Sequence, residues 1–427
     1  MNSILEGDFE QIIDGYRWSR HKEFLKPAFG NGCIADIPDY ILTSFGIGID
    51  QKYRNRQGWL RDSPDHLIFL LLDGFGFSTI KHSLEKYNMK YLNKFASNSE
   101  FNLVTSVFPS TTSTATVSYH TNMSPIDHRI MGYTSYIPEA GTVCNMISLT
   151  PLGRKEHCLL DNGYEMSWIR DHGTIYNKLQ KNDVDSFLYL PYAIRNSGLT
   201  RITANGANIS PYHSISQMLT ALKRNLSTAK GKTFHFCYVS TIDTISHKIG
   251  PYTQETALEI ESIFMLLDEQ LLRSANLPKN IFMSISADHG HKVLEEKQKI
   301  DLSTDRMLKS YLSTPVVGDA RAPFMRTKEG LVESTISYLT EKYKKDFISV
   351  PSKELMAEGF FGAPSGVMED MSFLSDIILI PKNSTSIFDS SLKIVDPKNE
   401  SDTMIGMHGG LSCDEMLVPF LQRELNS

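Results

Sequence analysis

Apolar residues gather in three short runs that lack the alternation of a half-exposed strand: residues 67–72, 234–239 and 281–286. Short, largely apolar segments of this kind are typical of strands that are buried on both faces of a parallel sheet. A different spacing follows in residues 256–272, where apolar residues recur at a helical period. We therefore predict an α/β fold in which helices pack on a mostly parallel sheet.

Each apolar run is followed by side chains that can bind a metal ion. Asp73 follows the first run, Asp243 and His247 follow the second, and Asp288 and His289 follow the third. The carboxyl ends of parallel strands meet at one edge of a sheet, where α/β proteins place their sites. Residues 243 and 247 lie one helical turn apart, so their side chains could chelate one cation. The structural alternatives are turn formation, helix capping and ordinary hydrogen bonding.

Two further segments add a histidine and a group of hydroxyls. His408 precedes two glycines, which permit close approach of the backbone, although a lone histidine is more often structural than a ligand. Residues 110–116 are crowded with Ser and Thr ahead of a possible helix. They read either as a helix N-cap or as the source of a nucleophile, since cations and backbone amides stabilise an ionised hydroxyl. The residues alone do not select one hydroxyl.

The motifs occur in the order strand-Asp-Gly, Phe-Pro-Ser-x-Thr, Asp-x-x-x-His, Ala-Asp-His-Gly and a late His-Gly-Gly. This order resembles the alkaline phosphatase superfamily, and within it the bacterial members of the type I phosphodiesterase/nucleotide pyrophosphatase branch. The resemblance runs from Leu67 to Leu421. It implies an alkaline-phosphatase-like α/β core with a central, mostly parallel sheet flanked by helices, plus inserted cap segments.

The same comparison implies a site with two divalent metal ions. One ion is assigned to Asp73, Asp288, His289 and Thr112, and the other to Asp243, His247 and His408. Nitrogen and carboxylate ligands without a thiolate suit Zn²⁺ or Mn²⁺. The resemblance also makes Thr112 the nucleophile of a double displacement, in which water releases the product in the second step.

One position departs from the family pattern. Nucleotide pyrophosphatases carry an Asn that contacts a phosphate oxygen where this chain has Ala115. Loss of such a donor costs on the order of a hundredfold in rate. Ser113 and Thr114 could replace it through their hydroxyls, or Ser113 through its amide, or both could be bystanders. His291 could contact the substrate or the metal ligands. Alternatively, it is a surface or packing residue.

These residues predict a hydrolase that cleaves phosphodiester or pyrophosphate bonds in a nucleotide-like small molecule. The alternatives are a phosphomonoesterase or phosphomutase of the same superfamily, and a non-catalytic nucleotide-binding or defence protein. We expect an N-terminal arm over residues 1–64, a catalytic core over 65–421, and a C-terminal tail over 422–427. Because ligands from Asp73 to His408 must converge, we place cap insertions within the core, at roughly 150–205 and 292–373.

Composition limits the partners. The chain has 427 residues and a formal net charge of -6, which argues against general nucleic-acid binding and against binding to an anionic membrane. Residues 1–24 carry charges throughout, so they do not resemble a signal peptide or membrane anchor. The 5 Cys are scattered, and we expect a cytoplasmic protein without a disulfide framework. The sequence does not indicate an oligomeric state.

Overall fold

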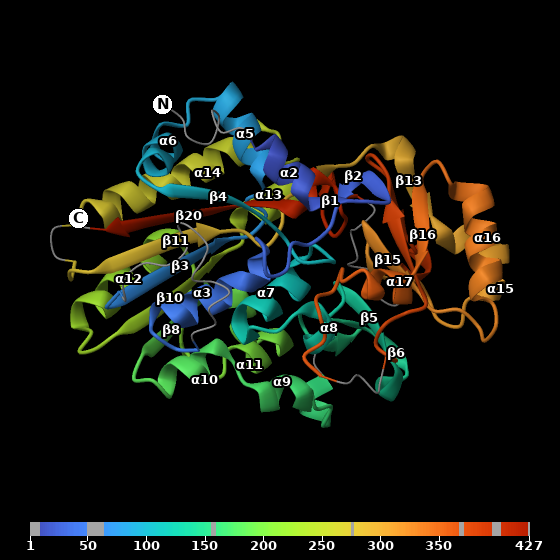
Figure 1. The fold of residues 1–427 in the computed structure, drawn as a ribbon, viewed down its shortest axis with the longest axis horizontal. Coiled ribbons are helices and arrows are strands. Elements are labelled where there is room, and N and C mark those ends of the chain that lie inside the picture. Colours follow the sequence, from blue (N-terminus) through green and yellow to red (C-terminus); the bar gives the residue numbers. More distant parts are fainter. Residues whose placement is uncertain are drawn as a thin grey trace.

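The computed structural model describes residues 9–48, 64–154, 159–274, 277–366, 371–394 and 403–425. Its main sheet has seven strands in the order β4-β20-β11-β3-β10-β8-β9 (Figure 1). These are β4 (Glu100–Thr105), β20 (Leu417–Leu425), β11 (Ile281–Ser286), β3 (His66–Leu72), β10 (Thr233–Val239), β8 (Asp185–Pro191) and β9 (Asn208–Tyr212). Only β20 runs against the others. The predicted mostly parallel sheet is confirmed.

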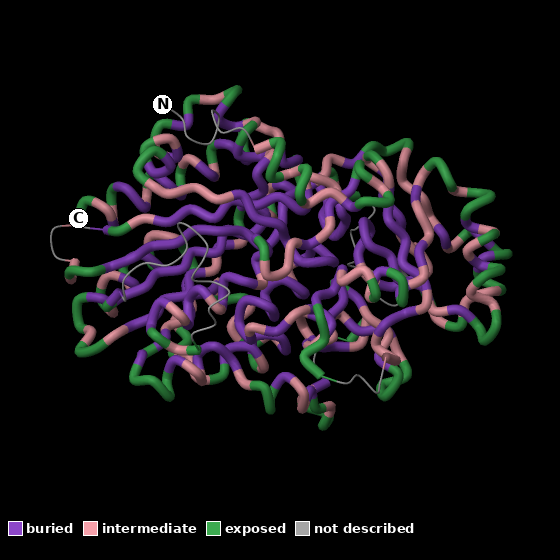
Figure 2. Tube along the Cα trace, viewed as in Figure 1, coloured by how far each residue is buried: buried purple, intermediate pink, exposed green. Residues whose placement is uncertain are grey.

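The three apolar runs form adjacent strands at the centre of this sheet. Strand β3 pairs in parallel with β10 on one side and β11 on the other. Every residue of β3 and β11 is buried, which explains why neither run alternates between apolar and polar positions. Figure 2 shows the same strands as the buried interior of the molecule. Three chain segments are thereby brought to one edge of the sheet.

Two groups of helices cover the main sheet. One contains α5 (Phe77–Lys86), α6 (Lys90–Ser97), α12 (Ile215–Thr228) and α14 (Gln254–Leu267). The other contains α3 (Ile37–Ser44), α7 (Thr112–Thr121), α10 (Ile175–Gln180) and α11 (Gly198–Thr203). The predicted helical segment 256–272 forms most of α14 and a following π-helical turn, Asp268–Leu272. Most of its apolar residues are buried, whereas Leu258 and Met265 are 56% and 38% exposed.

A second seven-stranded sheet lies at the other end of the long axis (Figure 1). Its strands, in spatial order, are β16 (Phe347–Pro351), β17 (Ile377–Pro381), β15 (Ala322–Met325), β14 (Val317–Asp319), β5 (Thr134–Ile137), β6 (Thr142–Asn145) and β7 (Thr150–Pro151). All of its pairings are antiparallel. Helices α15 (Arg306–Tyr311) and α16 (Val332–Tyr343) accompany it.

The secondary structure crosses the expected segment boundaries. Strand β8 lies within 150–205, yet it pairs with β10 in the main sheet. The second sheet takes β14 to β16 from 292–373, but it takes β5, β6 and β17 from outside both expected insertions. Residues 422–425, within the expected C-terminal tail, belong to β20. The division into arm, core and caps stays a prediction.

Hydrogen bonds tie the N-terminal arm to two segments in the C-terminal part of the chain. It contains α2 (Glu10–Tyr16), β1 (Arg17–Trp18) and β2 (His21–Leu25), ahead of α3. The Trp18 indole donates to Glu358 Oε2 at 2.6 Å, and the Leu25 amide donates to the Leu411 carbonyl at 2.8 Å. Residues 1–8 and 49–63 lie outside the described part of the expected arm. Among the described residues, no helix is long and apolar enough to cross a membrane, and the protein's location stays a prediction.

A buried ion pair joins the second sheet to the segment that carries His408. Arg321, in the turn between β14 and β15, donates to both carboxylate oxygens of Glu415 at 3.0 and 2.9 Å. Both side chains are fully buried. Glu415 also accepts a hydrogen bond from the Gly410 amide at 2.9 Å, two residues after His408. The pair therefore fixes the loop that delivers this histidine.

We expect Glu415→Ala to destabilise the fold by about 3–5 kcal/mol, because it leaves the Arg321 guanidinium buried without its counter-charge. Denaturant unfolding of the variant measures this loss. The double variant Arg321→Met, Glu415→Leu removes both charges and is expected to lose much less. If both variants lose the same free energy, packing and not the unpaired charge is responsible.

Candidate metal centre

Backbone hydrogen bonds hold the first two predicted segments together at the sheet edge. Asp73 directly follows β3, and its amide donates to the Val239 carbonyl at the end of β10, at 2.9 Å. The Asp243 amide, in α13 (Thr241–Lys248), donates to the Asp73 carbonyl at 3.1 Å. Asp288 and His289 follow β11 on the other side of β3. The edge position predicted for these side chains is where the structure places them.

The first ligand group consists of Asp73, Asp288 and His289, whose ligand atoms lie within 4.8 Å of one another. His289 Nε2 lies 3.5 Å from Asp73 Oδ1 and 3.5 Å from Asp288 Oδ2. Thr112, the first residue of α7, places its Oγ1 3.1 Å from His289 Nε2 and 3.5 Å from Asp73 Oδ1. The hydroxyl singled out by the resemblance therefore stands beside this group.

The second ligand group consists of Asp243, His247, His291 and His408. Asp243 Oδ1 lies 3.2 Å from His247 Nε2, 3.0 Å from His291 Nε2 and 3.8 Å from His408 Nε2. Strand pairing brings His408 to this group. β12 (Lys292–Val293), which follows His291, pairs with β19 (Gly406–Met407), which precedes His408. The His289 and His408 rings stack with centroids 3.6 Å apart, so the two groups are adjacent.

Glycines allow the loops of the two groups to touch. A Cβ on Gly290 would lie 2.1 Å from the Asp414 carbonyl oxygen, which no real side chain could tolerate. Gly74 has φ +74, and a Cβ there would lie 2.5 Å from His291 Cε1. The glycines that follow Asp73 and His289 therefore serve the close packing of the site.

The charge of the site fits divalent cations. Asp73 and Asp288 are 2% and 0% exposed, and Asp288 Oδ2 is buried without a hydrogen-bond partner among the described residues. Burial, and then the charges of Asp243 and Asp288, hold the pKa of Asp73 well above its usual range. Burial also opposes ionisation of Asp243, but His247 and His291 outweigh it and hold its pKa well below the usual range. Uncompensated buried carboxylates are costly, and a cation in each group would compensate them.

Residues 67–411 match the family model described as type I phosphodiesterase / nucleotide pyrophosphatase. The chain belongs to this family. It is thus a hydrolase of the phosphodiesterase/nucleotide pyrophosphatase class, and the predicted family, superfamily fold and enzyme class are confirmed. No curated protein sequence matches the chain.

Solved structures of low sequence identity share the fold of this phosphodiesterase family member. Murine ectonucleotide pyrophosphatase/phosphodiesterase 5 has a TM-score of 0.61 at 16% identity, over 84% of this chain and 87% of that one. The human protein of the same name gives 0.61 at 17% identity, with the same coverage. Phosphonoacetate hydrolase from Sinorhizobium meliloti, in complex with phosphonoformate, gives 0.57 at 16% identity, over 85% and 91%. An inactive variant of the murine enzyme was solved in complex with AMP.

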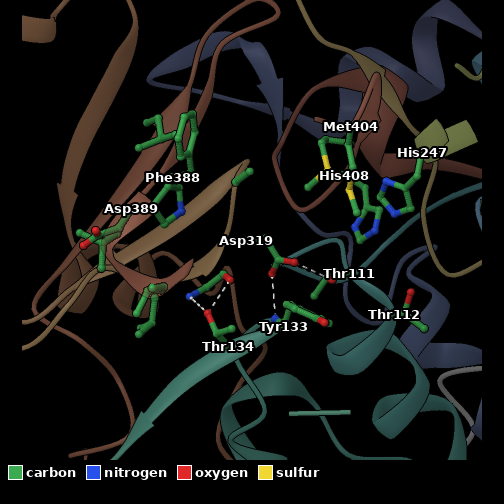
Figure 3. Close-up of a pocket in the computed structure, with 18 of the residues that line it drawn as sticks. Thr111, Thr112, Tyr133, Thr134, His247, Asp319, Phe388, Asp389, Met404 and His408 are labelled. Atoms are coloured by element: carbon green, nitrogen blue, oxygen red, sulfur yellow. Dashed lines mark hydrogen bonds between the residues drawn. The ribbon is translucent and has the colours of Figure 1, made fainter. Parts of the chain in front are cut away.

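Sequence reasoning missed two residues that touch the site of this phosphodiesterase family member. The Tyr238 hydroxyl donates a hydrogen bond to Asp73 Oδ2. Asp319 accepts from the Thr111 hydroxyl at 3.0 Å and from the Tyr133 amide at 3.1 Å (Figure 3), and burial raises its pKa to about 6. Tyr238 could have been noticed, because it stands near the end of an apolar run that leads into Asp243. Asp319 gave no such signal, since it comes from the second sheet.

Two cavities share Thr112 as a lining residue. The larger one measures about 390 Å³ and is lined by Thr112, Asp243, His247 and His408 together with residues of the second sheet (Figure 3). The smaller one measures about 120 Å³ and extends from Thr112 past Tyr238 to aliphatic residues of β8 and α11. Ala115 is fully buried and lines neither cavity, and the same holds for Ser113 and Thr114. The Ser113 and Thr114 hydroxyls therefore do not line either cavity.

Proposed function

We propose that the protein is a two-metal phosphodiesterase that cleaves phosphodiester or pyrophosphate bonds in a nucleotide-like small molecule, with Thr112 as the nucleophile. The observation that carries this proposal is the position of Thr112: its Oγ1 lies beside the first ligand group, and the residue lines both cavities. AMP binding by an inactive variant of the murine relative supports a nucleotide as one class of substrate.

The ligands divide into two sets in this proposal. Asp73, Asp288, His289 and Thr112 hold one ion; Asp243, His247 and His408 hold the other. When bound, the ions supply positive charge that favours the ionised nucleophile and the developing charge on the leaving oxygen. The donor set suits Zn²⁺, with Mn²⁺ as the alternative.

The residues of the chain then account for a double displacement. The Thr112 oxygen forms a bond to phosphorus while the bond from phosphorus to the leaving group breaks. Water then attacks the phosphothreonine and releases the phosphorylated product, which restores the Thr112 hydroxyl. Tyr238 orients the Asp73 carboxylate, and Asp319 orients Thr111 immediately before the nucleophile.

The cavities favour a diester over a monoester. A diester or pyrophosphate carries a substituent on each side of the reacting phosphorus, whereas a monoester fills only one side. Thr112 lines both a cavity of about 390 Å³ and one of about 120 Å³. Because the residue that carries the nucleophile lines both cavities, each can take one arm of the substrate.

We expect the metal-loaded protein to hydrolyse bis-p-nitrophenyl phosphate at least about tenfold more efficiently than p-nitrophenyl phosphate, because only the diester occupies both cavities. Release of p-nitrophenol, with and without a chelator, measures both rates. Preference for the monoester would instead indicate a phosphomonoesterase. A chelator-resistant rate would contradict a role for the metal ions.

A further inference from the structure

His291 differs from the other imidazoles of the site in its second ring nitrogen. His247 Nδ1 lies 2.7 Å from the Gly406 carbonyl, and His408 Nδ1 lies 3.1 Å from the Ser110 carbonyl. His289 Nδ1 lies 3.1 Å from the Gly290 carbonyl. Such contacts place the proton on Nδ1 and leave the Nε2 lone pair for a metal ion.

Nδ1 of His291 has no hydrogen-bond partner among the described residues, although the side chain is fully buried. The edge of the ring packs against Gly74, where a Cβ would come within 2.5 Å of Cε1 and 3.1 Å of Nδ1. A proton on this nitrogen would be a buried N–H without an acceptor, which folded proteins almost always avoid.

The proton is therefore better placed on Nε2, which lies 3.0 Å from Asp243 Oδ1. A carboxylate oxygen has two lone pairs, so Oδ1 can accept this hydrogen bond and still bind an ion. In that tautomer the Nε2 lone pair is no longer available to a metal. Of the four side chains in the second group, His291 thus donates a hydrogen bond, and the other three can ligate the ion.

We propose that His291 is a positioning residue that donates from Nε2 to Asp243 and does not ligate the second metal ion. The proposal rests on the two-metal site of the proposed function. Three protein ligands leave a tetrahedral ion one open position, as in catalytic zinc sites, whereas four close it, as in structural ones. His291 therefore keeps the second ion accessible to water and to the leaving group.

The test compares three variants loaded with Co²⁺, whose visible absorption reports its ligands. His291→Gln keeps an N–H donor, His291→Ala removes it, and His247→Gln replaces a ligand. Metal content, chelator-competition affinity and the absorption spectrum are measured for each folded protein, besides the rate of diester hydrolysis.

We expect His291→Gln to bind two ions with nearly the wild-type affinity and spectrum. His291→Ala should keep that spectrum but bind one ion about 10–100-fold more weakly, as is usual when the hydrogen-bond partner of a ligand is lost. His247→Gln should change the spectrum and lose an ion.

Two results would overturn the proposal while leaving the two-metal site intact. If His291→Gln changes the spectrum as His247→Gln does, His291 is a fourth ligand. If His291→Ala binds both ions like the wild type, the hydrogen bond has no role. A wild-type chain that binds fewer than two ions would instead contradict the proposed function itself, and this inference with it.

Discussion

Replacing Thr112 with Ala is expected to lower diester hydrolysis by at least about a thousandfold, because the substitution removes the oxygen that forms the covalent intermediate. The Thr112 Oγ1 lies 3.1 Å from His289 Nε2, beside carboxylates that can hold a cation without it. Metal content should therefore stay at two ions per chain. Steady-state kinetics and elemental analysis of the same preparation measure both quantities.

Thr112→Ser is the matched control, since it keeps the hydroxyl and loses only the methyl group. It should retain a substantial part of the activity and show phosphate on the serine after rapid quenching with substrate. Thr111→Ser keeps the neighbouring hydroxyl, which donates a hydrogen bond to Asp319, and is expected to change the rate little. Activity of Thr112→Ala near that of the wild type would rule out Thr112 as the nucleophile.

Replacing Asp243 with Ala is expected to remove one of the two ions and to lower the rate at least about a hundredfold, since a bound ion contributes several kcal/mol to the transition state. Asp243 Oδ1 is the atom on which His247, His291 and His408 converge. Without this carboxylate the proposed ligands His247 and His408 are both neutral, so no negative charge remains among them to balance the ion. Metal content by elemental analysis and diester kinetics test this expectation.

His408→Ala should reproduce the loss of the same ion, because His408 belongs to the same group. Cys413→Ser is the control; it changes a half-buried residue outside both ligand groups and should leave metal content and rate unchanged. Two ions and normal turnover in Asp243→Ala would contradict the assignment of the second group.

The main sheet could be predicted because its central strands are buried on both faces. Burial of β3 and β11 leaves no exposed position to interrupt the apolar runs, so each strand is visible as a continuous segment. The second sheet left a weaker signal. Its strands are short, come from segments between 134 and 381, and include the pair β5 and β14, which are about 180 residues apart in sequence. Strand β8 was placed with the expected insertions because its signal is also weaker: Asp185 and Phe187 are not fully buried, so the strand is not a continuous apolar run.

The sequence by itself determined which side chains stand at the ends of the central strands, because parallel strands must deliver them to one edge. The family resemblance already divided these side chains between two ions, and only the tertiary structure decided which other residues join the two groups. His291 enters the second group through its contact with Asp243, Tyr238 reaches Asp73 from the neighbouring strand, and Asp319 arrives from the second sheet. Hydrogen bonds between distant segments depend on packing, and no local pattern in a chain encodes it.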